Sequence, residues 1–296
     1  MAKKFDASEP VKIAGYTISD YHAEKRPLTI AETFIYSSNI ATARIADELG
    51  TDELKTFFSD LGLLSAPNLD LPEVGAPIVP SPWGRIHTLT SSYGHGLAVS
   101  PVQVATAVAS IVNGGFLVHP SLERREVQND KTSIRIISSE VSARMDALLR
   151  LNVTQGTAKQ ADVPGYQTGG KTGTAEQPGA GGGYDEHRLI SSFVGAFPME
   201  KPEYVIFVML DEPKGDKATY GFATAGWVAA PMFAKVVKGM SAILAMAPQE
   251  IAPEQDIDAP YRHFISSEEE AKAQRLAAER RHKAELEKEA KYALSR

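Results

Sequence analysis

The spacing of apolar and helix-capping residues predicts consecutive helices near the start of the chain. Thr29-Ile30-Ala31-Glu32 has the form of a capping box, in which the hydroxyl and the carboxylate accept free N–H groups of a first helical turn. This helix is expected to end at Tyr36-Ser37-Ser38-Asn39. A second helix follows directly, with an apolar face that ends at Gly50, and a third fits residues 52–61.

Further along, the pattern predicts helices on either side of a group of strands. Ser100-Pro101-Val102-Gln103 combines an N-cap serine, a proline at the first helical position and a capping-box glutamine, so a helix is expected to run from there to Asn113. Other helices are expected over 140–152 and 227–245, and strands over 166–175, 191–197 and 203–210. Residues 1–28 suit a strand or an extended arm, and 63–96 suit a long ordered loop.

The composition changes after residue 247. Residues 248–265 combine prolines with acidic residues, which is typical of a linker. Residues 266–296 hold eight Lys or Arg and seven Glu among many alanines, which favours a solvated helix with i,i+4 ion pairs. A helix that binds a partner is the alternative, but no sustained apolar stripe supports it. We therefore predict a domain over 1–247, a linker over 248–265 and a charged helical tail over 266–296.

Charge and composition exclude several classes of protein. The chain has 31 Lys+Arg against 37 Asp+Glu, a net charge of -6, which argues against a nucleic-acid-binding surface. It has no cysteine, so disulfides, thiolate zinc sites and cysteine nucleophiles are excluded. Neither a signal peptide at Met1 nor an apolar run long enough to span a bilayer is visible, so the chain as written is expected to be soluble.

One short motif suggests nucleotide binding. The segment from Gly165 to Thr172 matches the phosphate-loop pattern Gly-x4-Gly-Lys-[Ser/Thr], and residues 205–211 resemble an apolar strand ending in a magnesium-binding aspartate. The mechanism of a phosphate loop requires a buried strand before it and a helix directly after it. Here Pro164 precedes the motif and glycines and prolines follow it, so a nucleotide-binding protein is disfavoured.

The same residues suit an exposed strand. Lys171-Thr172-Gly173-Thr174 would present hydroxyls and one cation along an extended edge, and its glycine would let a bound peptide approach closely. Ser37-x-Asn39 lies at a predicted helix junction, where both residues are commonly helix caps. Tyr93-Gly94-His95-Gly96 reads as a turn. Each motif alone is weak.

Together and in this order, these motifs resemble those of penicillin-binding transpeptidases. The set is Ser-x-Asn, Tyr-Gly-His-Gly with Ser-Pro-Val-Gln, Gln-Gly-Thr-Ala and Lys-Thr-Gly-Thr-Ala. It is similar to the C-terminal part of a class B penicillin-binding protein of the division type, over about residues 5–245. The resemblance implies an α/β fold, with a mainly antiparallel sheet flanked by helices, of the serine transpeptidase and β-lactamase type and incomplete at the N-terminus.

The resemblance also implies an activity and site residues. Such enzymes cross-link peptidoglycan stem peptides and are acylated by β-lactams. By position, Ser37 would relay a proton, Lys171 would tune Ser37, and Asn39 would bind the substrate backbone. Thr172, Gly173 and Thr174 would bind the substrate: Thr172 and Thr174 would hold its terminal carboxylate, with the Thr174 N–H in the oxyanion hole. No cofactor, metal or nucleic acid is implied. The full-length family member would face the periplasm from the inner membrane and bind cell-division proteins.

One family motif is missing. No serine in the sequence is followed by lysine three residues later, so the Ser-x-x-Lys nucleophile and base are absent. We interpret the chain as truncated at an internal methionine, and an inactive peptide-binding or β-lactam-binding module is the alternative. A β-lactamase is disfavoured because no deacylating glutamate is evident and the stretch from Asn39 to Lys171 is long. Loss of the nucleophile helix predicts poor independent folding.

Overall fold

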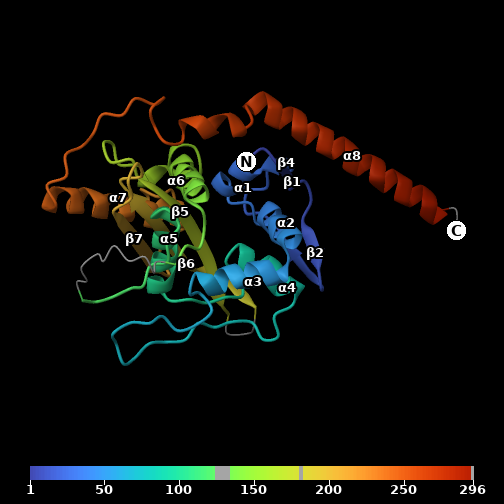
Figure 1. Ribbon diagram of the computed structural model, residues 1–296. Helices are drawn as coiled ribbons and strands as arrows, with labels where there is room; N and C mark the ends of the chain where they lie inside the picture. The colour runs from blue at the N-terminus through green and yellow to red at the C-terminus, as the bar shows by residue number, and fades with distance from the viewer. Residues whose placement is uncertain (124–133, 180–182, 295–296) are drawn as a thin grey trace.

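The computed structural model describes residues 1–123, 134–179 and 183–294 (Figure 1). Its centre is an antiparallel sheet in the order β5-β6-β7, formed by Gly169–Pro178, Tyr184–Phe197 and Tyr204–Asp211. Lys171 pairs with Val194, which in turn pairs with Phe207. The strands lie close to the predicted ranges. The start of β6 was not predicted, because polar residues between Asp185 and Arg188 hide the strand pattern.

Helices cover both faces of this sheet. Helix α7, Ala225–Ile243, packs on one face, where the rings of Phe193 and Phe233 lie 4.7 Å apart between centroids. Helices α5 (Pro101–Val112) and α6 (Ser139–Thr154) pack on the other face around buried Ala196. The short 3-10 helix η1, Lys159–Ala161, follows α6 and contributes Ala161 to the α7 side of the core. The predicted helices over 100–113 and 140–152 are both confirmed.

The N-terminal part forms a second group of elements beside the sheet. Strands β1 (Lys4–Asp6) and β4 (Pro27–Thr29) pair with each other, as do β2 (Val11–Ile13) and β3 (Tyr16–Ile18). Helices α1 (Ile30–Ile35), α2 (Asn39–Leu49) and α3 (Thr51–Asp60) follow, so the three predicted helices are confirmed.

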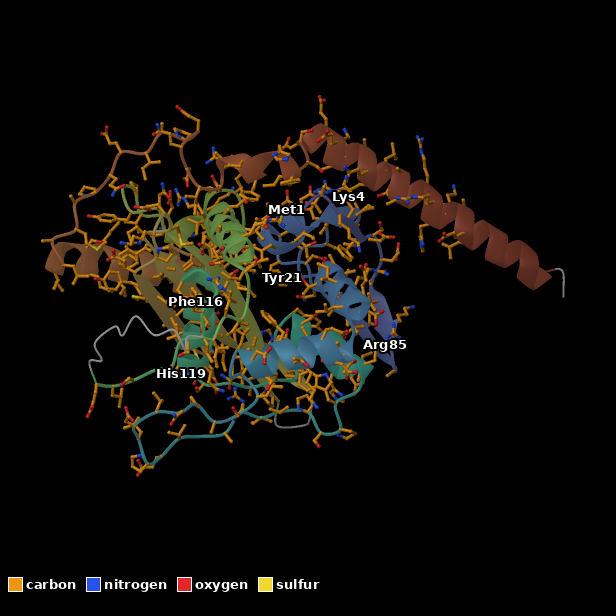
Figure 2. All side chains as sticks on the ribbon, in the orientation of Figure 1. Met1, Lys4, Tyr21, Arg85, Phe116 and His119 are labelled. Carbon is orange, nitrogen blue, oxygen red and sulfur yellow. The ribbon has the colours of Figure 1, made fainter. Side chains whose placement is uncertain are left out.

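The prediction of a loop throughout residues 63–96 was wrong, because α4 occupies Arg85–Ser92. Serines and threonines give this stretch a weak helical pattern. Tertiary contacts stabilise it instead: Leu89 packs against Ala43, and Arg85 forms an ion pair with Asp47 of α2 at 2.6 Å. Figure 2 places Arg85 at the end of the molecule where α4 meets α2.

The C-terminal residues return across the molecule. After α7, the chain passes through the 3-10 helix η2 (Ala259–Phe264) into α8 (Glu268–Leu294), whose far end projects away from the body (Figure 1). Within the segment predicted as a linker, Asp256 and Asp258 are buried, and Asp256 forms an ion pair with Arg150 at 2.9 Å. This segment therefore bonds to α6, and its Ile257 packs against the apolar cluster that contains Ala196 of the sheet.

Candidate functional site

The junction between α1 and α2 presents Ser37 to solvent. The Thr29–Glu32 capping box starts α1, as the sequence predicts, and α1 ends at Tyr36. Ser37 then takes a left-handed conformation with φ 55°, which turns the chain before Ser38 caps α2. The hydroxyl of Ser38 accepts the Ala41 N–H at 3.1 Å. Capping by the buried Ser38 leaves the exposed Ser37 free for another contact.

Strand β5 brings Lys171 to this junction. Its Nζ donates to Ser37 Oγ at 2.7 Å and to the Thr172 carbonyl at 3.2 Å. The same Nζ lies 6.0 Å from the centre of the Phe34 ring. Burial lowers the pKa of Lys171 to about 8, although part of the side chain still contacts solvent. A cation that ionises this close to neutrality can adjust its charge as a proton moves nearby.

Asn39 lies at the start of α2 but is directed to another partner. Its Nδ2 donates to the Ser19 carbonyl at 3.0 Å. The neighbouring residue Asp20 accepts the Ser38 hydroxyl at 2.7 Å and the Ile40 N–H at 2.9 Å. Residues 19 and 20 therefore occupy the N-terminus of α2, and the bond recorded for the Asn39 amide goes to them and not to Lys171.

The other predicted residues follow Lys171 along β5. Thr172 Oγ1 lies 2.9 Å from Thr157 Oγ1, which belongs to the Gln-Gly-Thr-Ala motif. Gly173 and Thr174 are exposed, and Thr174 Oγ1 accepts the Ala225 N–H at 3.0 Å. Two hydroxyls and one ammonium thus lie along a single strand edge, which suits a carboxylate ligand.

The sequence analysis missed Asn152, which connects the pieces of this site. It is fully buried in α6, and its Nδ2 donates to the Gly170 carbonyl at 2.8 Å. Its Oδ1 accepts the N–H and the hydroxyl of Thr157, both at 3.2 Å. A polar residue inside the apolar run 147–153 is the signal that could have identified it.

The phosphate-loop alternative fails on geometry. Lys171 and Thr172 lie within a ten-residue strand, and no helix follows them. A Cβ at Gly170 would lie 2.3 Å from Phe193 Cζ, so this glycine serves packing and not phosphate binding. Among the described residues, no group of three or more acidic or histidine side chains could hold a metal ion. No helix in the described part of the chain is long and apolar enough to cross a membrane.

Comparison with solved structures supports the fold. The transpeptidase domain of penicillin-binding protein 3 from Burkholderia pseudomallei superposes with a TM-score of 0.75 at 31% identity, covering 84% of this chain and 75% of that one. Penicillin-binding protein 3 from Mycobacterium tuberculosis, complexed with ampicillin, gives a TM-score of 0.74 at 26% identity, covering 87% and 60%. These similarities confirm the predicted antiparallel α/β fold of the serine transpeptidase type.

Sequence comparison gives the family. A probable peptidoglycan D,D-transpeptidase FtsI of Caulobacter vibrioides is 36% identical over 272 residues, 86% of this chain and 46% of that protein. Stage V sporulation protein D of Bacillus subtilis is 31% identical over 234 residues, 75% of this chain and 35% of that protein. The chain thus spans less than half the length of these relatives. The penicillin binding protein transpeptidase domain model matches residues 2–260, and the chain belongs to this family.

Proposed function

We propose that this chain carries the substrate-holding part of a serine-type peptidoglycan D,D-transpeptidase. The observation that carries the proposal is the 2.7 Å bond between Lys171 and Ser37, two motif residues separated by 134 positions. The named activity of the Caulobacter vibrioides relative and the ampicillin complex of the Mycobacterium tuberculosis neighbour support peptidoglycan stem peptides and β-lactams as ligands.

Ser37 and Lys171 are suited to moving a proton. The Lys171 ammonium donates to Ser37 Oγ, so the hydrogen of the Ser37 hydroxyl remains free to be donated to a leaving amine. Lys171 can then return a proton to Ser37, because a pKa of about 8 places both of its charge states within reach near neutral pH. We assign Ser37 the proton relay and Lys171 the electrostatic control of that relay.

Strand β5 is suited to holding the terminal carboxylate of a peptide. The Thr174 hydroxyl already accepts the Ala225 N–H, so its own hydrogen can be donated to a ligand. Thr172 and the exposed Gly173 extend the same edge, and we assign the Thr174 N–H to the oxyanion hole. Asn39 is proposed to bind the substrate backbone, which requires exchange of its present bond to Ser19.

We assign the residues of this chain to substrate binding and proton relay, and none of them to acylation. No serine in the sequence has a lysine three residues after it, and without a nucleophile the relay has no acyl group to act on. By analogy with the named FtsI relative, we propose a place on the periplasmic face of the bacterial inner membrane and partners among the cell-division proteins.

Equilibrium binding of a fluorescent penicillin to this chain tests the proposal. We expect saturable binding that D-Ala-D-Ala peptides displace and that denaturation abolishes. Thr172→Val and Lys171→Ala each remove a charge-assisted contact to the carboxylate, worth about 1.5–3 kcal/mol, so binding should weaken about 10–100-fold. Lys235→Ala, which changes an exposed lysine of α7, is the matched control. Equal binding by all variants would refute the site. Fluorescent penicillin that stays attached to the chain after denaturation would reveal an acylated residue, which contradicts the proposal.

A further inference from the structure

The segment that leads into α8 packs directly on α1. Tyr261, Phe264 and Ile265 lie against a cluster that contains Ala31 and Ile35 of α1. The same cluster includes two buried leucines of α6, Leu148 and Leu151. Apolar side chains from the C-terminal part of the chain therefore close one side of the helix that precedes Ser37.

Buried polar contacts join the same two segments. Glu32 of α1 has no exposed surface, and its Oε1 accepts the Ser266 N–H at 2.9 Å and lies 3.0 Å from Arg26 Nη1. Burial alone would raise the pKa of Glu32, but the N–H groups of Thr29 and Ser266, the Ser266 hydroxyl and Arg26 together hold it below its usual value. The Thr29 hydroxyl adds a bond to the Phe264 carbonyl at 2.9 Å.

A second connection involves the first turns of α8. Gln274 Oε1 accepts from Arg26 Nη1 at 3.3 Å, and Arg275 forms an ion pair with Glu24 at 2.7 Å. The fully buried Arg26 thus has partners on both α1 and α8. Because a buried guanidinium needs its partners, these bonds fix the distance between the two helices.

Helix α1 is too short to hold its own position. It has six residues, and isolated helices shorter than about 12–15 residues are marginal in water. It nevertheless supplies Phe34, and Ser37 follows directly after its end, so both groups that surround the Lys171 ammonium depend on where α1 lies.

Residues 261–266 are named the C-terminal clasp. We propose that this clasp positions α1 and thereby holds Ser37 against Lys171. Glu32 and the main chain of Ser266 are the positioning residues. The clasp begins just after residue 260, where the family match ends. The catalytic importance of the clasp rests on the proposed function. Its structural effect, that the environment of Lys171 depends on residues 261–266, does not.

The environment of Lys171 is measured by the pH dependence of its reaction with an amine-reactive acylating reagent, without ligand, followed by peptide mass spectrometry. The midpoint of that pH dependence reports the pKa of Lys171. Burial is the cause of the lowered Lys171 pKa, and no charged group among the described residues contributes to it. Its recorded contacts are the Ser37 hydroxyl, the Thr172 carbonyl and the Phe34 ring. If α1 moves away, water reaches the ammonium and the midpoint rises towards 10.5.

Ser266→Pro in the full chain removes the N–H that Glu32 accepts, and Ile265 has φ −96° and ψ 125°, which a following proline tolerates. We expect the Lys171 midpoint to move from about 8 to about 9 or higher. Ser266→Ala retains the N–H and loses only the hydroxyl that also bonds to Glu32, so it should move the midpoint less than Ser266→Pro does. Leu286→Ala, on the half-exposed outer part of α8, should leave the midpoint unchanged.

A folded Ser266→Pro protein with an unchanged midpoint would overturn the clasp. If circular dichroism shows that Ser266→Pro is unfolded, Phe264→Ala and Ile265→Ala provide the same test from within the clasp, and an unchanged midpoint in both overturns the inference. Penicillin binding is measured separately. A midpoint shift without any ligand binding would therefore refute the proposed function and leave the clasp standing.

Discussion

Lys171 is the residue on which the candidate site depends most. Its ammonium bonds to a hydroxyl and a carbonyl and lies near an aromatic ring, but its burial disfavours the charged form and lowers the pKa to about 8. The motif indicated that a lysine and a serine would meet. It did not indicate how strongly the lysine would be desolvated, because Phe34, which lies over the ammonium, belongs to no motif.

We predict that Lys171→Met raises the free energy of unfolding at pH 7 while weakening penicillin binding about 10–100-fold. The pKa is about 8 in the folded state and near 10.5 when unfolded, so between these values the unfolded chain binds more protons. Wild-type stability therefore rises from pH 8 to pH 10.5, and the advantage of the variant shrinks over that range. Thermal unfolding at pH 7 and pH 10 checks this prediction, because each kcal/mol of stability shifts the melting temperature by about 2–4 °C.

Lys235→Met is the control for this prediction, because Lys235 is exposed on α7 and should change stability little at either pH. A Lys171→Met protein that melts below the wild type at pH 7 would contradict the account of the lysine as a desolvated cation.

At the scale of elements, the sequence predicted those helices and strands that carry their own local signals. The capping boxes at Thr29 and Ser100 fix helix starts that the structure confirms. Helix α4 was missed because Leu89 and the Arg85–Asp47 ion pair stabilise it from outside its own sequence. The approach of β5 to Ser37 was expected from the family resemblance, but the role of buried Asn152 was not, because it bonds to two segments that are separate in the sequence.

We predict that two glycine substitutions have opposite effects. A Cβ at Gly170 of β5 would lie 2.3 Å from Phe193 Cζ and 2.6 Å from the Val194 carbonyl oxygen, so Gly170→Ala should destabilise by about 1–3 kcal/mol or more. Gly239 lies inside α7 with no atom within 4 Å of its Cβ position, so Gly239→Ala should stabilise by about 0.5–1 kcal/mol. Urea unfolding of both variants measures the difference, and equal effects would contradict the packing described for β5 and β6.

At the scale of the whole molecule, the C-terminal residues are joined to the N-terminal ones by buried contacts. Composition predicted a linker over 248–265 and a solvated tail after it, and prolines with acidic residues do occur there. Composition could not predict that Asp256 and Asp258 are buried against partners, because those partners, Arg150 and Thr154, lie more than a hundred residues earlier. The boundaries between the domain, linker and tail stay a prediction.

We predict that Glu32→Gln destabilises the molecule at pH 7 and that this effect disappears in acid. Removing the carboxylate breaks the buried ion pair with Arg26 and leaves Glu24, at 3.3 Å, as the other carboxylate partner of that guanidinium, so we expect a cost of about 1.5–3 kcal/mol. The pKa of Glu32 is lowered in the folded state, so its contribution is complete above the unfolded value near 4.5 and is lost as the pH falls through the folded value. Denaturant unfolding from pH 7 to pH 3 follows this, and a difference that does not depend on pH would contradict the role of the ionised carboxylate.

The span of the clasp has a consequence for biosynthesis. Ser266 is synthesised 234 residues after Glu32, its partner. At about 5–20 residues per second, a ribosome needs about 10–50 s to make this stretch. Until then the nascent chain holds Glu32 and Arg26 without the N–H and amide groups that cover them in the finished fold. Helix α1 can take its final place only after residue 266 has been added, so the proton-relay pair is completed late in translation, whatever the order in which the sheet and its helices form.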